Sequence, residues 1–151
     1  MSRQAIDGTT LPRIHPRIDA DQHLEHAALT REAIGAVYAA YNEMKFGYQE
    51  RYYQRAVALE LQQKGIPFQR EQPHPIRYQN RIIGRYFVDF VIDSSVVLEL
   101  KVAKEILETH INQVLAYLRH TGLTVGILAV ITPQRVLIKR IVYRASEKIR
   151  E

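Results

Sequence analysis

Cysteine is absent from the 151-residue sequence. Disulfides, thiol catalysis and cysteine-based zinc or iron–sulfur sites are therefore excluded. No apolar run reaches the roughly 18 residues that a membrane-spanning helix needs. The first residues also lack the apolar stretch of a secretory signal. We therefore expect a cytoplasmic protein with no membrane partner.

The composition is that of an ordinary globular protein, with 46% hydrophobic and 25% charged residues. The length suits one domain with a real core. The formal net charge is +5 and the pI is about 9.6. A positive charge suits a polyanionic partner, because Lys and Arg side chains near phosphates release counterions. On charge alone, a solvated basic surface is the favoured explanation.

Residues 1–26 contain prolines and polar residues without periodicity, which predicts a flexible N-terminal arm. We expect a single domain over residues 27–145 and a short tail over 146–151. Thr30 is the expected cap of the first helix.

The periodicity of apolar residues predicts three helices and five strands in the order α-α-β-β-β-α-β-β. The expected fold class is therefore α+β, a mixed central sheet flanked by helices. The last helix should carry Leu107 on its apolar face and end at Gly122. The expected helices cover residues 30–44, 49–64 and 104–120, and the expected strands 67–78, 81–92, 96–102, 123–131 and 136–143.

Two strongly apolar strands contain charged residues. Residues 86–92 are apolar or aromatic except for Asp89, and residues 96–102 are apolar except for Glu99 and Lys101. Strand side chains alternate between faces, so Glu99 and Lys101 project to the same side.

The loop between these strands determines whether the carboxylates meet. A three-residue loop at 93–95 pairs Ile92 with Val96 and places Asp89 opposite Glu99, about 5 Å apart at their Cβ atoms. A two-residue loop would instead place Asp89 opposite Leu100, with the carboxylates on different faces.

Two carboxylates facing each other repel, and a bound cation would convert this repulsion into coordination. The alternative is structural: Glu99 pairs with Lys101, and another base neutralises Asp89. Burying a charge in such apolar strands costs several kcal/mol unless the charge is well paired. The residues alone leave both interpretations open.

Four segments in the same order resemble the GxxExxY protein family of the PD-(D/E)XK nuclease superfamily. The resemblance extends over about residues 30 to 143 and includes the Asp89 strand. It implies a core like that of restriction endonucleases. The segments are Gly47-Tyr48-Gln49-Glu50-Arg51-Tyr52-Tyr53, Gly65-Ile66-Pro67-Phe68, Val97-Leu98-Glu99-Leu100-Lys101 and Thr121-Gly122-Leu123.

The sequence departs from the family pattern at three places. Ala40-Tyr41 stands where members usually have Val-His, and Met44-Lys45-Phe46 replaces a Leu-Gly-Pro-Gly type of turn. Gln54 stands where an acidic residue is common. None of these changes removes an expected metal ligand.

The resemblance implies that Asp89, Glu99 and the carbonyl of Leu100 ligate a divalent cation. Mg²⁺ or Mn²⁺ is expected, because these ions favour oxygen ligands. Lys101 would orient the attacking water or stabilise the transition state. Glu50 would contact the metal through water or complete a second metal position, although a first-turn glutamate also suits the helix dipole.

Gln113 and Tyr117 are four residues apart and share a helix face, which we expect to lie beside the apolar stripe. In similar helicase-associated exonucleases this pair touches the active site or the nucleic-acid backbone. Packing on the helix surface is the alternative. His110 lies one turn earlier, and we leave it out of the metal site.

The sequence therefore predicts a metal-dependent nuclease that hydrolyses phosphodiester bonds in nucleic acid, DNA in preference to RNA. The alternative is a catalytically silent nucleic-acid- or partner-binding module with the same fold. Several nucleases of this class act as dimers or rings, so the resemblance also allows a homo-oligomer.

Overall fold

The computed structural model describes residues 25–145. The predicted N-terminal arm lies outside them apart from residues 25 and 26, and the predicted tail at 146–151 lies outside them completely. The described residues form the predicted order of elements: α2 (Ala27–Met44), α3 (Glu50–Gln63), β1 (Phe68–Tyr78), β2 (Arg81–Ile92), β3 (Val96–Val102), α4 (Glu108–Thr121), β4 (Val125–Ile131) and β5 (Val136–Val142). The α+β class is confirmed.

The five strands form one mixed sheet in the spatial order β1-β2-β3-β4-β5. Only the β3–β4 pair within it is parallel, and α4 makes the crossover between these two strands. The other pairs are antiparallel. All seven residues of β4 are buried, as expected for an apolar strand that is covered on both faces.

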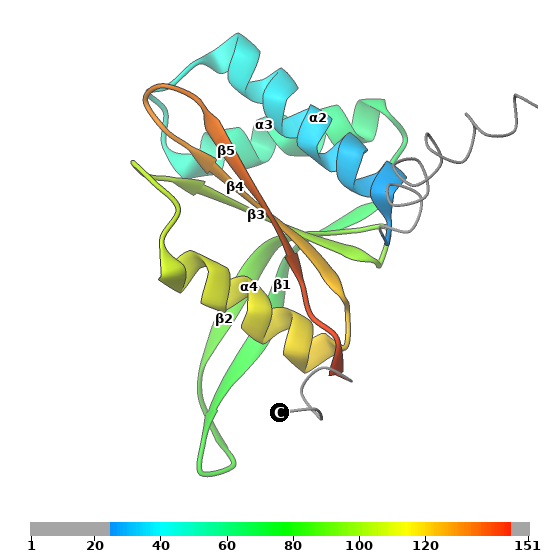
Figure 1. The fold of residues 1–151 in the computed structure, drawn as a ribbon, viewed down its shortest axis with the longest axis vertical. Helices are drawn as coiled ribbons and strands as arrows, with labels where there is room; N and C mark the ends of the chain where they lie inside the picture. The colour runs from blue at the N-terminus through cyan, green and yellow to red at the C-terminus, as the bar shows by residue number, and fades with distance from the viewer. Residues whose placement is uncertain (1–24, 146–151) are drawn as a thin grey trace, which may run out of the picture.

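Helices cover both faces of the sheet, as Figure 1 shows. On one face, α2 and α3 pack over a core cluster that includes Tyr53, Leu61, Phe90 and Leu98. On the other face, α4 covers a second cluster, which includes Val88, Val97 and Leu118. β1 is an edge strand, which explains how it accommodates Pro73 and Pro75.

Two predicted helix starts are wrong. α2 begins before Thr30, so this residue is not the cap; it lies buried in the first turn, where its hydroxyl donates to the carbonyl of Ala27. α4 begins at Glu108 rather than at Lys104. Leu107 is extended and 43% exposed, so it is not part of the buried helix face. Its N–H donates to the imidazole of His110, which marks the start of α4.

Candidate active site

The two strand carboxylates meet in the predicted register. Ile92 pairs with Val96 across the three-residue turn, and the ladder continues to Phe90 opposite Leu98. The ladder ends there, and Asp89 and Glu99 stand one residue beyond it on their strands, where side-chain contacts replace the ladder bonds. The backbone N–H of Asp89 donates to Oε1 of Glu99 at 2.9 Å. The backbone N–H of Leu100 donates to Oδ2 of Asp89 at 2.7 Å. Each carboxylate is therefore held by the backbone of the neighbouring strand.

The side-chain alternation of β2 is interrupted at Asp89. Val88 and Val91 both pack on the α4 side, whereas Phe90 between them packs under α2 and α3. In a regular strand Val88 and Phe90 would share one face. On β1, Glu71 stands across from Asp89, between the ladder pairs Arg70–Phe90 and Gln72–Val88. It has a φ of 52°, a left-handed conformation uncommon for this residue type. The irregularity lets Asp89 direct its carboxylate between the strands.

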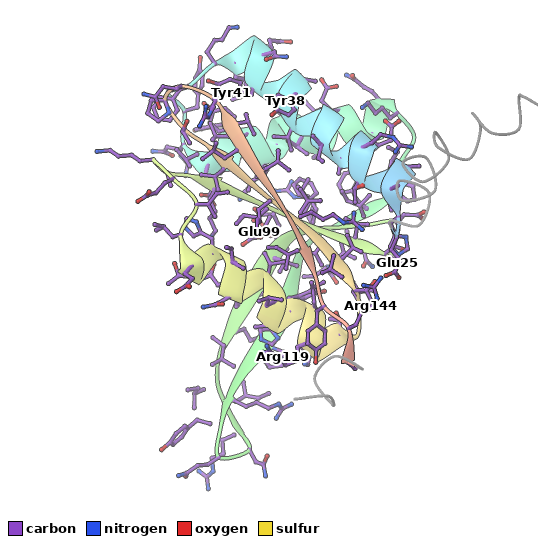
Figure 2. The ribbon with its side chains drawn as sticks, viewed as in Figure 1. Glu25, Tyr38, Tyr41, Glu99, Arg119 and Arg144 are labelled. Carbon is purple, nitrogen blue, oxygen red and sulfur yellow. The ribbon has the colours of Figure 1, made fainter. Side chains whose placement is uncertain are left out.

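Burial and mutual repulsion dominate the electrostatics of this pair. Burial and the charge of Glu99 raise the pKa of Asp89 to about 8, although the N–H of Leu100 and the charge of Lys101 oppose this shift. Burial also raises the pKa of Glu99, which is 1% exposed and lies in the interior (Figure 2). Hydrogen bonds from Tyr86 and from the Asp89 N–H stabilise the Glu99 carboxylate and limit this shift.

Lys101 lies beside the carboxylates, as the strand alternation predicts. Its Nζ is 3.6 Å from Oε2 of Glu99. The Lys101 side chain keeps 20% of its surface exposed, whereas the Glu99 side chain keeps 2%. The ammonium group therefore stands between the buried carboxylates and solvent, where it can contact a bound anion.

Glu50 reaches the site from the first turn of α3. Its Oε1 accepts the backbone N–H of Val102 at 3.2 Å, at the end of β3. One turn later, Gln54 donates its amide to Oδ1 of Asp89 at 2.9 Å and to Oε2 of Glu50 at 3.4 Å. Gln54 therefore joins the carboxylates of α3 and β2.

The segment from Gly47 to Tyr53 positions Glu50. Gly47 has a φ of 132°, which a residue with a side chain rarely adopts. The hydroxyl of the fully buried Tyr53 donates to the carbonyl of Lys45 at 2.5 Å. The ring of Tyr53 meets that of Tyr48 edge to face. These contacts fix the loop before α3, so Glu50 enters the helix facing β3.

Comparison with known proteins identifies the family of the chain. Residues 27–141 match the model of a family described as the PD-(D/E)XK nuclease superfamily. The chain belongs to the PD-(D/E)XK nuclease superfamily. The Asp89, Glu99 and Lys101 side chains on β2 and β3 supply the residue types for which this superfamily is named. No curated protein matches the chain.

Two solved structures are similar to this superfamily member. The crystal structure of SSO0001 has 20% sequence identity and a TM-score of 0.51, and the match covers 82% of this chain and 63% of that one. This likeness supports the fold alone. An alkaline exonuclease (LHK-Exo) from Laribacter hongkongensis has 10% identity and a TM-score of 0.38, covering 87% of this chain and 77% of that one. That score is too low to support a conclusion.

Two polar residues of the site are missed by the sequence patterns. Tyr86 donates its hydroxyl to Oε2 of Glu99. Regular alternation would place Tyr86 on the face opposite to Asp89. The contact depends on the interruption at Asp89, so a sequence pattern does not predict it. Gln54 stands out in the sequence only as a departure from the GxxExxY pattern, yet it hydrogen-bonds Asp89.

The side chains of Gln113 and Tyr117 lie in different surroundings. Tyr117 is 6% exposed and belongs to the core under α4, so the expectation that it lies beside the apolar stripe is wrong. Its ring packs edge to face on that of His74. Gln113 is half-buried and lines a cavity together with Tyr86, and its Oε1 has no hydrogen-bond partner. Gln113 therefore borders the site, whereas Tyr117 supports the helix.

The carboxylate oxygens of Asp89 and Glu99 suit a hard cation that keeps several water ligands. Over residues 25–145, no three His, Cys, Asp or Glu side chains form a ready cluster for a metal ion. The Asp89 and Glu99 oxygens each have a donor in hydrogen-bonding range, so a cation would use their remaining lone pairs. Mg²⁺ is commonly bound by one or two carboxylates plus water and substrate phosphate. The site therefore fits such an ion better than an ion that needs a protein cage.

Among the helices over residues 25–145, none is long and apolar enough to cross a membrane.

Proposed function

We propose that this protein is a nuclease that hydrolyses phosphodiester bonds in DNA with the help of Mg²⁺ or Mn²⁺. The observation that carries the proposal is the pairing of half-buried Asp89 with buried Glu99, with Lys101 beside them. Two adjacent carboxylates with raised pKa values are costly to a fold unless a cation or a reaction uses them. The family match supplies the reaction class.

Asp89 and Glu99 would hold the metal ion in this proposal, together with the carbonyl of Leu100. When bound, Mg²⁺ or Mn²⁺ polarises a scissile phosphate and lowers the pKa of a coordinated water. Lys101 lies within 3.6 Å of Glu99 and partly open to solvent, so it can bind the phosphate and stabilise the charge that develops on it.

The remaining polar residues hold this geometry in place. Gln54 orients Asp89, and Tyr86 orients Glu99. Glu50 accepts the N–H of Val102 and keeps the end of β3 close to α3, and its second oxygen faces Gln54. In the proposal Glu50 contacts the metal through water, because Gln54 lies between it and Asp89.

The motif from Gly47 to Tyr53 supports membership of the narrower GxxExxY family. Gly47, Glu50 and Tyr53 each have a physical role that explains the spacing: the turn, the active-site carboxylate and the anchor of the loop. Gln54 in place of an acidic residue distinguishes this chain from the common pattern. We place the chain in that family as part of the proposal.

The decisive experiment incubates the purified protein with single- and double-stranded DNA and RNA in Mg²⁺, Mn²⁺ or EDTA. Cleavage of DNA in Mg²⁺ or Mn²⁺, abolished by EDTA and by Asp89→Asn, would support the proposal. Asp93→Asn is the matched control, because Asp93 is an exposed carboxylate in the β2–β3 turn. Cleavage at equal rates by the wild type and Asp89→Asn would contradict the assigned site. Binding of nucleic acid without cleavage would favour the silent binding module.

A further inference from the structure

The β1–β2 hairpin forms a two-stranded ribbon whose tip extends away from the body of the molecule past α4 (Figure 1). We define the ribbon as residues 72–88, which pair from Gln72 opposite Val88 to Tyr78 opposite Arg81. Several of its large apolar side chains are exposed, most of all Ile83 at 66% and Tyr78 at 63%. At its base Val88 and Tyr86 pack into the core cluster under α4. Toward its tip the ribbon contributes little to a core, so the exposed side chains there are available for a partner.

The charge of the ribbon has one sign. It contains Arg77, Arg81 and Arg85, all of them exposed, and no Asp or Glu. Glu71 and Asp89 are the acidic residues that bound it on either side. Exposed arginines between apolar side chains, without any carboxylate, suit a polyanion that also presents apolar edges. Duplex DNA is such a partner, because its phosphates attract arginine and its major groove exposes thymine methyl groups.

The base of the ribbon is continuous with the active site. A cavity of about 710 Å³ lies between the ribbon and α4. The residues that line it include Arg77, Arg119, His74 and His120 but no carboxylate. Tyr86 also lines the cavity and donates to Glu99, so the basic surface ends at the carboxylate pair. Nδ1 of His74 and Oε1 of Gln113 are buried without partners in this cavity wall.

We propose that the ribbon is a DNA-binding element that lies in the major groove of the duplex next to the scissile bond. The inference rests on the proposed nuclease function and names its substrate as double-stranded DNA. A two-stranded ribbon fits the major groove of B-form DNA, which is roughly 12 Å wide. The major groove of A-form RNA is deep and narrow, and side chains do not reach its bases. The ribbon therefore selects duplex DNA over duplex RNA.

The alternative occupant, a second copy of this chain, is disfavoured by charge. A symmetric dimer would bring the same patch of each copy together. The three arginines of one ribbon would then face those of its partner without a carboxylate in either ribbon to neutralise them.

The length of the ribbon determines how many base pairs of a duplex it can contact. Asp89 lies nine positions after Asn80 at the turn, which corresponds to about 30 Å at a rise of roughly 3.3 Å per residue. This distance equals about nine base pairs at 3.4 Å each. The affinity should therefore rise with duplex length until about nine base pairs extend beyond the active site, and should rise little thereafter.

The test measures binding of labelled 8- and 24-base-pair DNA in EDTA by fluorescence anisotropy. Arg77→Ala/Arg81→Ala should weaken binding of the longer duplex at least about tenfold and reduce the salt dependence by about two counterions. Arg77→Lys/Arg81→Lys keeps the charge and should retain most of the affinity. The matched control is Arg31→Ala/Lys64→Ala, since these exposed basic residues lie on α2 and at the end of α3.

Three outcomes would overturn the proposal. In the first, Arg77→Ala/Arg81→Ala binds the longer duplex with an affinity within twofold of the wild type. In the second, the Arg31→Ala/Lys64→Ala control loses as much affinity as the ribbon variant. In the third, the ribbon variant changes from dimer to monomer while its affinity for DNA is unchanged. If the alanine pair does not fold, Ile83→Ser tests the same surface and should also weaken binding of the longer duplex. Cleavage is assayed separately. If the wild type cleaves no nucleic acid but the ribbon variant binds DNA more weakly than the wild type, the proposed role of the ribbon is supported and the proposed nuclease function is refuted.

Discussion

The raised pKa of Asp89 predicts how the metal-free protein responds to pH. Asp89 has a pKa of about 8 in the folded state because burial and the charge of Glu99 disfavour its ionisation. In the unfolded chain an aspartate titrates near about 3.9. Between these values the folded state binds more protons than the unfolded state. The free energy of unfolding therefore falls as pH rises from about 4 to about 8.

The magnitude is bounded by the single proton that Asp89 carries. One proton gives a slope of at most about 1.4 kcal/mol per pH unit. The solvent near Lys101 and the coupled titration of Glu99 reduce the realised slope. A total loss of a few kcal/mol across this range is a large share of the stability of a typical domain.

Urea unfolding in EDTA at half-unit pH steps measures this effect in the wild type and in Asp89→Asn. The amide introduced by this substitution has no proton to lose, so the variant should lose less stability with rising pH. The substitution also weakens the contacts of Oδ1 and Oδ2, so slopes rather than absolute stabilities should be compared. The pKa values of His74 and His110 are lowered by burial, and their titration is common to both proteins. Parallel stability curves for the two proteins would refute the reasoning, and Asp93→Asn should behave as the wild type.

Three further experiments test other contacts of the site. Glu99→Gln and Lys101→Ala should each reduce cleavage by at least about a hundredfold while DNA binding in EDTA changes less; wild-type rates in both would point to a contaminating nuclease. Mg²⁺ or Mn²⁺ should raise the melting temperature of the wild type, because it binds the folded site, and an equal rise in Asp89→Asn would show binding elsewhere. Tyr86→Phe removes a donor from buried Glu99 and should cost about 1–3 kcal/mol at pH 8. The cost should become smaller as pH falls, because burial raises the pKa of Glu99 and protonation removes the charge that the hydroxyl stabilises; a loss independent of pH, or an equal loss in exposed Tyr78→Phe, would contradict the role of this hydrogen bond.

The strands of the site could be predicted from the sequence because their signals are local. β2 and β3 have the predicted bounds, and the turn at Asp93 adopts the three-residue form that sets the register. Asp93 and Ser94 have φ values of 49° and 54°, which short polar residues tolerate in a tight turn. Alternation then places Glu99 and Lys101 together.

The contacts of Tyr86 and Gln54 could not be predicted because they depend on tertiary structure. Tyr86 reaches Glu99 because the alternation of β2 is interrupted at Asp89, opposite Glu71 of an edge strand. No residue type in β2 marks this change of face. Gln54 reaches Asp89 through the packing of α3 on the sheet, and these residues are 35 positions apart.

Glu50 shows why a short motif can predict a contact between distant residues. Its bond to the backbone of Val102 spans 52 positions, yet the residues that orient it lie within the nine positions from Lys45 to Tyr53. Gly47 turns the chain, and Tyr53 ties the turn to the helix through the carbonyl of Lys45. Because this unit is rigid, packing α3 on β3 brings Glu50 to the site without any further adjustment. The spacing of glycine, glutamate and tyrosine therefore encodes a local shape, and the packing of Tyr53 in the core places that shape at the candidate active site.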